Sequence, residues 1–440
     1  MDIRRRLMAL LAAALLVLAT ATGALAADAR PDAPKVLRNW YGLMLELVRH
    51  TATYSPPVAS RAFGYLGVAA FEAAVGGSDR LVSLVGQLNG LKAVPGREPG
   101  LAYDEAVIAH TVMATMVRSF FGNTGPTGQR AVAAADRKWG GEVAAGVPPD
   151  VLERSTAFGT LMADSIIEWS KGDGGAEITN LGFPLDYELP SGEGKWVPTS
   201  AIALQQLPLL PQWGSVRPFA APMGVSCAIP PPPEYSIDPQ SQFYREAVEV
   251  LDTARGLTAE QAAIARFWSD DPMLSTTPPG HWISIALQVA EAQQLPLDRS
   301  VDLMARLGVA MSDAFIGCWR EKYVYNLVRP ISYIRKQIDP AWEPILITPP
   351  FPEYPSGHST VSGAAATVLT AMFGEDFGFV DATGSPDGRA PRSFPSFWAA
   401  ADEAGISRLF GGIHYRAAIV SGLDQGRCIG AYTVALKTLK

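Results

Sequence analysis

The chain has 440 residues, of which 48% are hydrophobic, 18% are charged and 9% are aromatic. This composition is typical of a packed globular protein and excludes a disordered chain and a polytopic membrane protein. The net charge of −7 also argues against a nucleic-acid-binding protein, whose surface would be basic.

Residues 1–26 have the features of a secretory signal peptide. Three arginines, Arg4 to Arg6, precede an apolar run over residues 7–21, and a small-residue cleavage site ends at Ala26. We therefore expect the mature chain to begin at Ala27, with a net charge of −9 because three arginines and one aspartate are removed. It would be periplasmic or secreted. No membrane span is expected after cleavage, although a retained N-terminal anchor is the alternative.

Helical spacing of apolar residues runs through most of the chain and predicts a mainly α fold. In the first half it predicts helices over 36–50, 58–74, 103–121 and 150–169. In the second half it predicts helices over 243–254, 258–268, 281–293, 300–328, 356–373, 396–409 and 414–436. Thr258 and Gln261 form the capping box that opens one of these helices. Alternating strand patterns are almost absent.

A stretch rich in proline, residues 182–239, cannot continue a helix. We expect an ordered crossover that joins an N-terminal helical half, 27–240, to a C-terminal helical half, 241–440; a flexible linker is the alternative. The predicted architecture is two packed helical bundles.

The cysteines Cys227, Cys318 and Cys428 are far apart and odd in number. Their spacing supports neither a disulfide framework nor a zinc site. We expect buried thiols, with one disulfide as the alternative in an oxidising compartment.

Three clusters in the last 120 residues carry candidate chemistry: KYVYNLVRP at 322–330, PSGH at 355–358 and SRLFGGIH at 407–414. Lys322 and Arg329 are seven residues apart, so on one continuous helix their cationic heads would share a face. Each cation taken alone is more often part of a solvated helix face, but the three clusters together predict an oxyanion site.

The PSGH sequence falls at a predicted helix start, where free N–H groups and the helix dipole favour an anion. Ser356 offers a hydroxyl, and Gly357 lets the backbone approach closely. Arg408 adds a planar guanidinium, and His358 and His414 add two imidazoles.

The order K-x6-R-P, P-S-G-H and S-R-x5-H resembles the signature shared by vanadium-dependent haloperoxidases and type 2 phosphatidic acid phosphatases. The resemblance covers residues 322–414 directly and implies a helical fold. Trp319 and Phe351 stand where the haloperoxidases place apolar residues around the halide, and the chain is similar to the exported bacterial branch that includes iodoperoxidases. The phosphatase pattern continues with an aspartate after the second histidine, but here Ala418 stands there, which favours the peroxidase.

The resemblance implies a vanadate cofactor, with His414 as the protein ligand of vanadium. It implies that the oxygens of vanadate are bound by Lys322, Arg329, Ser356, Gly357 and Arg408. His358 would act as acid and base, Lys322 would polarise peroxide, and hydrogen peroxide would oxidise iodide or bromide, with a small organic acceptor as a further possible partner. The alternatives are an exported acid phosphatase with a phosphohistidine at His414, and an oxyanion-binding protein without turnover.

Two upstream segments also resemble parts of the family's site. Asp271, in WSDD, is predicted to hold one arginine through a buried ion pair, and a turn-capping role is the alternative. His281, in PGHW, is predicted to line the halide pocket.

Overall fold

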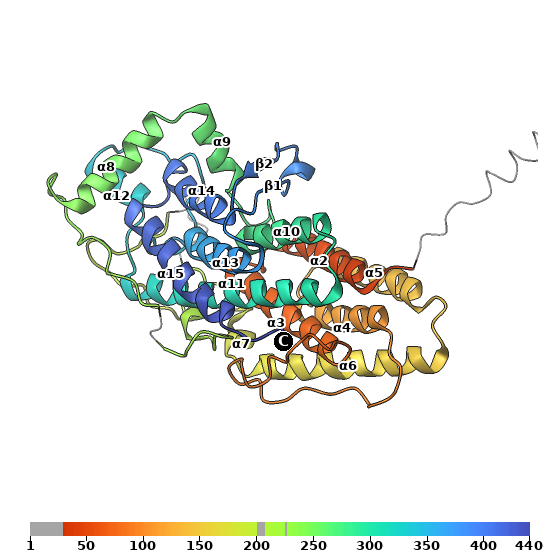
Figure 1. Cartoon of the computed structure of the whole chain (residues 1–440). Coiled ribbons are helices and arrows are strands. Elements are labelled where there is room, and N and C mark those ends of the chain that lie inside the picture. Colours follow the sequence, from red (N-terminus) through yellow and green to blue (C-terminus); the bar gives the residue numbers. More distant parts are fainter. Residues whose placement is uncertain (1–29, 200–206, 225–226) are drawn as a thin grey trace, which may run out of the picture.

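The computed structural model describes residues 30–199, 207–224 and 227–440, and it is mainly helical (Figure 1). The mainly α prediction is therefore confirmed. The predicted signal peptide lies outside the described residues.

The N-terminal half contains α2 (Ala33–Arg49), α3 (Pro56–Val75), α4 (Glu105–Phe120), α5 (Pro126–Ala144), α6 (Pro149–Lys171) and the short α7 (Gly175–Ile178). Side chains of Asp32 and Asp104 cap the starts of α2 and α4. The sequence analysis missed α5 because only Val132 and Val143 of this helix are buried, so its apolar periodicity is weak.

The C-terminal half contains α8 (Gln242–Arg255), α9 (Ala259–Phe267), α10 (Thr277–Ala292), α11 (Leu297–Tyr325), α12 (Pro330–Gln337), α13 (Gly357–Phe373), α14 (Phe397–Phe410) and α15 (Arg416–Val434). The predicted capping box of Thr258 and Gln261 is present at the start of α9. A small hairpin of β1 (Phe379–Asp381) and β2 (Arg392–Phe394), with Asp381 opposite Arg392, separates α13 from α14, and short 3-10 turns lie at Trp213–Ser215 and Ser385–Asp387.

One helix prediction was wrong in a way that bears on the site. The helix expected to reach residue 328 ends at Tyr325, because Asn326 adopts a left-handed conformation with φ of 48°. Arg329 precedes a proline and is extended, and Pro330 opens α12. Lys322 and Arg329 therefore do not share a helix face; a turn brings them together.

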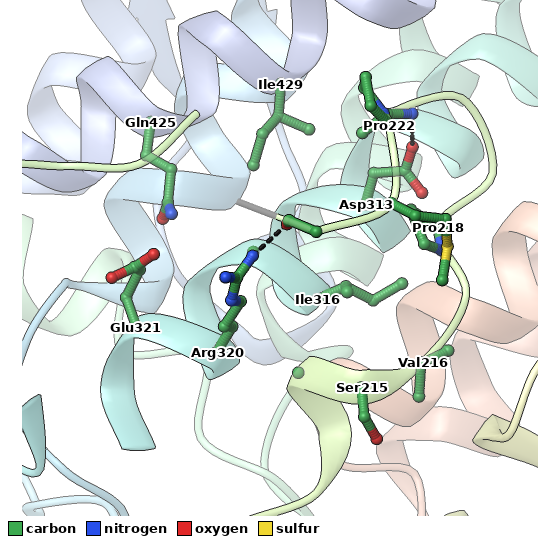
Figure 2. A pocket seen from close by; sticks show the side chains of 15 residues that line it. Ser215, Val216, Pro218, Pro222, Asp313, Ile316, Arg320, Glu321, Gln425 and Ile429 are labelled. Carbon is green, nitrogen blue, oxygen red and sulfur yellow. Dashed lines mark hydrogen bonds between the residues drawn. The ribbon is translucent and has the colours of Figure 1, made fainter. Parts of the chain in front are cut away.

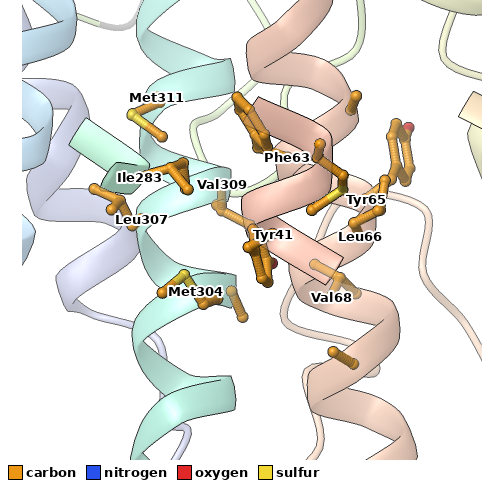
Figure 3. Close-up of a cluster of buried hydrophobic side chains, with 14 of the residues drawn as sticks. Tyr41, Phe63, Tyr65, Leu66, Val68, Ile283, Met304, Leu307, Val309 and Met311 are labelled. Atoms are coloured by element: carbon orange, nitrogen blue, oxygen red, sulfur yellow. The ribbon is translucent and has the colours of Figure 1, made fainter. Parts of the chain in front are cut away.

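The two halves meet along α3 and α11 (Figure 3). Every residue of α3 except Val75 is buried. The two backbones approach so closely that a Cβ on Gly67 would lie 2.6 Å from the carbonyl oxygen of Met304, and one on Gly308 would lie 2.5 Å from that of Phe63. Among the described helices, α3 alone is long and apolar enough to span a membrane, but it is the core helix of this interface.

The described parts of the crossover are bonded to the C-terminal half, as predicted for an ordered segment. The backbone N–H of Trp196 donates to the Asn326 carbonyl (2.8 Å), and that of Leu209 donates to the Pro350 carbonyl (2.8 Å). A disulfide joins Cys227 of the crossover to Cys428 of α15. The expectation of three buried thiols was therefore wrong for this pair, whereas Cys318 is a buried thiol.

Candidate functional site

A cavity of about 320 Å³ opens between the two halves. Most of its lining, which we call the apolar wall, consists of Phe183, Leu209, Pro272, Leu274, Pro278, Phe315, Trp319, Ile347, Pro349, Pro350 and Phe351. Its floor contains Gly357, His358, Arg408 and His414. The structure thus brings the second and third sequence clusters together in one cavity whose lining is largely apolar.

The PSGH segment forms the start of α13, as predicted. Ser356 is the N-cap, and its Oγ accepts a bond from the Ser359 N–H (3.2 Å). Gly357 and His358 occupy the first turn, where backbone N–H groups are free for an anion. The N–H of Ser356 donates to the carbonyl of Ala418 (3.0 Å), which ties the turn to α15.

His414 follows a turn in which Gly412 has a φ of 78°. Its Nδ1 lies 2.8 Å from Oε1 of Glu353, and its Nε2 lies 3.1 Å from Nη1 of Arg329. A guanidinium only donates, so Nε2 accepts from Arg329, and Nδ1 carries the proton that it donates to Glu353. Burial, followed by the charge of Arg329, holds the pKa of His414 well below its usual value, so the imidazole stays neutral and able to bind a metal.

Glu353 was missed by the sequence analysis, and it changes one argument. It is fully buried, and its Oε1 also accepts from the Tyr415 N–H (2.9 Å). Burial raises the pKa of this carboxyl to about 8. It supplies the orienting carboxyl group that the alanine at 418 seemed to remove, so Ala418 does not separate the peroxidase from the phosphatase. The available signal was a lone acid in an apolar, proline-rich segment directly before PSGH.

The two cations of the first cluster are completely buried. Arg329 donates from Nε to the Phe351 carbonyl (2.9 Å) and from Nη1 to the Ile413 carbonyl (2.9 Å), whereas its Nη2 has no partner among the residues that the structure describes. The ammonium of Lys322 instead donates to backbone carbonyls of Pro352, Glu353 and Pro355. Burial lowers the pKa of Lys322 to about 7.

Arg408 is the third buried cation of the site, and it lines the cavity. Its guanidinium donates to the carbonyl of Trp268 and, from Nε, to Oγ of Ser407 (3.0 Å). Asp271 lines the cavity and lies near enough to Arg408 to feel its charge, but no direct ion pair joins Asp271 to an arginine among the described residues, so the predicted buried pair was wrong. Asp271 carries a raised pKa from burial, and backbone carbonyls hold Arg408 instead.

His281 does not line this cavity, contrary to the prediction. It lies behind the floor, with Nδ1 2.9 Å from Asp270 and Nε2 2.8 Å from Asp381. Asp270 in turn lies 3.7 Å from Nε2 of His358. Asp270 and Asp381 were both missed, because only the folded chain brings these distant acids to one histidine.

Trp319 and Phe351 pack against each other on the cavity wall, with ring centroids 4.9 Å apart. The Trp319 indole donates to the Leu209 carbonyl (3.1 Å). The ring of Phe351 also lies 5.1 Å from Nζ of Lys322 and 5.0 Å from Cζ of Arg329. The two aromatic residues therefore join the apolar wall to the buried cations.

A second pocket, of about 220 Å³, lies under the crossover (Figure 2). Arg320 there bonds the Gly224 carbonyl, and buried Asp313 accepts the N–H groups of Phe219, Ala220 and Ala221. Those bonds account for Asp313 as an anchor of the crossover.

The residues of the main cavity suit a small tetrahedral or trigonal-bipyramidal oxoanion. Two buried arginines, a buried N-cap serine and free N–H groups of a helix start surround the floor. The Nη2 of Arg329 is a buried donor that finds no partner in the described part of the chain, and an anion oxygen would satisfy it. His414 presents a neutral imidazole nitrogen, a common ligand of transition metals.

Fold and site together define a helical-bundle protein with a buried cationic site for an oxoanion or a metal oxoanion. The family described as the second helical-bundle domain of VCPO matches residues 302–439. A crystal structure of a bacterial vanadium-dependent iodoperoxidase is 38% identical, with a TM-score of 0.84, over 92% of this chain and 97% of that one. This chain therefore belongs to the vanadium-dependent haloperoxidase family.

Two further relatives are more distant. Vanadium chloroperoxidase of Curvularia inaequalis is 27% identical, and the alignment covers 36% of this chain and only 36% of that protein. A bacterial vanadium-dependent chloroperoxidase, in its holo form, is 16% identical with a TM-score of 0.66, over 88% of this chain and 94% of that one, which shows the shared fold alone.

Proposed function

We propose that this chain oxidises a halide, iodide or bromide, with hydrogen peroxide and with vanadate as its cofactor. The observation that carries this proposal is the neutral His414, whose Nε2 faces the buried Arg329 and which lines a largely apolar cavity together with Arg408. The balanced reaction takes one halide, one peroxide and one proton to hypohalous acid and water. Its substrates are small, and its proton has to be delivered inside the cavity.

Vanadate, when bound, supplies a Lewis acid that activates peroxide without a change of oxidation state. His414 would be its protein ligand through Nε2, with Glu353 fixing the tautomer. Arg329, Arg408 and the first turn of α13 would bind its oxygens. Lys322 donates to the carbonyls of Pro352, Glu353 and Pro355, and so it orders the segment that carries Glu353 and adds positive charge beside it.

His358 would carry the proton. It lines the cavity, and burial together with the charge of Arg408 lowers its pKa to about 4. A neutral His358 can accept a proton from a group in the cavity and return one to the leaving oxygen.

The apolar wall supports iodide as the preferred halide. Trp319 and Phe351 offer the halide little hydrogen bonding, so the halide that loses the least hydration energy enters at the lowest cost. Iodide, the larger ion, is less strongly hydrated than bromide.

A specific observation supports the second candidate, an acid phosphatase. The bond from His414 Nδ1 to Glu353 is the kind of orientation that a nucleophilic histidine needs. The family membership and the apolar cavity favour the peroxidase.

One comparison tests both candidates. Purified protein is stripped of metal and then assayed for peroxide-dependent iodide and bromide oxidation, with and without added vanadate, and for phosphomonoester hydrolysis. The proposal predicts oxidation that vanadate restores, faster with iodide. Hydrolysis without vanadate-restored oxidation would establish the phosphatase instead.

We also propose that the protein is exported to the periplasm or beyond. The disulfide between Cys227 and Cys428 supports this location, because such bonds persist mainly in oxidising compartments. Cell fractionation with an antibody would test it; a reduced, cytoplasmic protein would contradict it.

A further inference from the structure

Four titratable side chains form a line from the cavity floor to the β-hairpin: the partly exposed His358 and the buried Asp270, His281 and Asp381. They come from four separate segments, namely the start of α13, the loop after α9, α10 and β1. Only His358 and Asp270 line the cavity, so the other two act, if at all, through Asp270.

His281 is held between two carboxylates. Its Nδ1 lies 2.9 Å from Oδ1 of Asp270, and its Nε2 lies 2.8 Å from Oδ2 of Asp381. A neutral imidazole has only one N–H, so both contacts are hydrogen bonds to ionised carboxylates only when His281 is an imidazolium. Trp268 stacks on the ring, with centroids 4.4 Å apart and planes 20° apart, which favours the same charged form.

The surrounding charges agree with this geometry. Burial by itself would lower the pKa of His281, but Asp270 and Asp381 outweigh it and raise the pKa to about 10. Burial would likewise raise the pKa of Asp270, but His281 outweighs it and the pKa lies well below its usual range.

Backbone conformation singles out the same loop. Asp270 has a φ of 48° and Thr277 has a φ of 63°, and a β-branched residue rarely adopts a positive φ. Such conformations persist where the surrounding structure enforces them, often at functional sites. Here they bring the carboxylate of Asp270 between His281 and His358.

We propose that Asp270 is the positioning residue of His358, and that His281 and Asp381 keep Asp270 ionised and correctly oriented. Nε2 of His358 is buried and faces Asp270, at a distance of 3.7 Å that is too long for a hydrogen bond. Because Nε2 points at Asp270, we assign Nδ1 to the cavity. This inference rests on the proposed function, in which His358 takes a proton at Nδ1 and returns it there. While His358 is protonated, the Asp270 carboxylate offsets its charge.

Two neighbours of His358 therefore act in opposite directions. Asp270 stabilises the imidazolium of His358, whereas the positive His281, like Arg408, destabilises it. His414, across the cavity floor, is neutral and contributes little. Asp270→Asn should lower the pKa of His358. His281→Gln removes a positive charge but keeps an amide donor for the Asp270 carboxylate, so it should raise the pKa of His358. A purely structural role would not produce opposite shifts.

The chain offers a matched control. Asp173 forms a buried ion pair with Arg61 at 2.6 Å in the N-terminal half, with no contact to the cavity. Asp173→Asn therefore removes a buried carboxylate without touching His358.

The first experiment measures the pH dependence of kcat for vanadate-loaded wild type, Asp270→Asn, His281→Gln and Asp173→Asn. We expect Asp270→Asn to lower kcat about 100-fold, with KM for iodide changed little, and to move the acidic limb of the profile to lower pH. His281→Gln should move this limb to higher pH, and Asp173→Asn should leave it in place. Identical profiles in all variants would overturn the proposal.

The second experiment needs no activity. The chain has five histidines, so ¹⁵N-histidine labelling of the metal-free protein gives a spectrum simple enough to assign. We expect one imidazolium, His281, to persist above pH 8 in wild type and to lose its proton at lower pH in Asp381→Asn. A neutral His281 at pH 7 in wild type would overturn the proposal.

The two failures are distinguishable. If wild type shows no vanadate-restored halide oxidation, the proposed function is wrong, and the histidine titrations still decide whether Asp270 controls His358. If Asp270→Asn fails to fold, Asp381→Asn, which lies farther from the cavity, tests the same line of residues through the titrations of both histidines.

Discussion

The two imidazoles at the cavity floor are each backed by a carboxylate, but in different ways. His414 is bonded directly to Glu353 at 2.8 Å, and Glu353 is fixed by the Tyr415 N–H. His358 lies 3.7 Å from Asp270, which is bonded instead to His281. His414 and Glu353 thus form a short, direct hydrogen bond. His358 has only a longer contact with Asp270, whose negative charge is stabilised by His281.

The difference fits two kinds of chemistry. A metal ligand needs a constant tautomer and a constant lone pair, which a short bond to Nδ1 provides. An acid and base has to change its charge, which a longer contact to a permanent anion permits. The same residue type thus receives different roles from the placement of its neighbours.

The largest expected effect comes from removing His414, the proposed protein ligand of vanadium. His414→Ala should abolish vanadate-restored halide oxidation, by at least ~10³-fold, because no other imidazole on the floor has a tautomer fixed by hydrogen bonds at both ring nitrogens. Activity and vanadate binding are measured together. His110→Ala, which removes a buried histidine of α4, is the control and should keep activity. Full activity of His414→Ala would contradict the assignment.

Removal of the tight carboxylate should have the next largest effect. Glu353→Gln keeps the shape but weakens control of the His414 tautomer, and we expect a loss of about 10–100-fold in vanadate affinity. Vanadate titration of the stripped enzyme measures it. Glu72→Gln is the matched control, since Glu72 is a buried glutamate bonded to the Leu84 N–H and to Ser83 far from the cavity. Equal affinities would show that Glu353 serves packing alone.

The charge on His281, which supports Asp270, should make the free energy of unfolding depend on pH. The pKa of His281 is raised from 6.5 to about 10 on folding, so its contribution is fully present below pH 6.5 and is lost as the pH rises toward 10. Denaturation of the metal-free protein across this window should show wild type losing stability relative to His281→Gln. Parallel curves would mean that His281 is neutral in the fold.

A smaller effect should follow a change of the apolar wall. Phe351→His places a polar ring beside Lys322 and Arg329 and should raise the kcat/KM ratio of bromide to iodide by about tenfold, because the smaller ion gains a hydrogen-bond donor. Phe183→His, at the exposed rim, is the control. An unchanged ratio would remove Phe351 from halide selection.

The smallest effect on the site should come from the disulfide. Cys227→Ser should lower the unfolding free energy by about 2–5 kcal/mol, since the bond closes a loop between residues 201 apart in sequence, and should leave vanadate affinity unchanged at 25 °C. Thermal unfolding with and without reductant measures this. Cys318→Ala, which leaves the disulfide intact, is the control, although its buried thiol adjoins the Pro355 carbonyl.

Predictions that depend on neighbouring residues succeeded. The start of α13 at Gly357, with Ser356 as its cap, follows from residues within one turn of each other. The same holds for the capping box of α9. The helix end at Asn326 was missed because asparagine occurs both inside helices and in the left-handed conformation that ends them, so the residue type alone does not mark the end.

The sequence by itself determined the mainly helical fold, the helix starts and the residue types of a cationic oxoanion site, because periodicity and capping act over a few neighbouring residues. Only the tertiary structure decided that Glu353 bonds His414, that Asp270 and Asp381 hold His281, and that Cys227 pairs with Cys428. Apart from Asp270 and His281, which are 11 residues apart, these partners lie 61 to 201 residues apart in the chain. Their pairing depends on how whole helices pack, which local spacing does not encode.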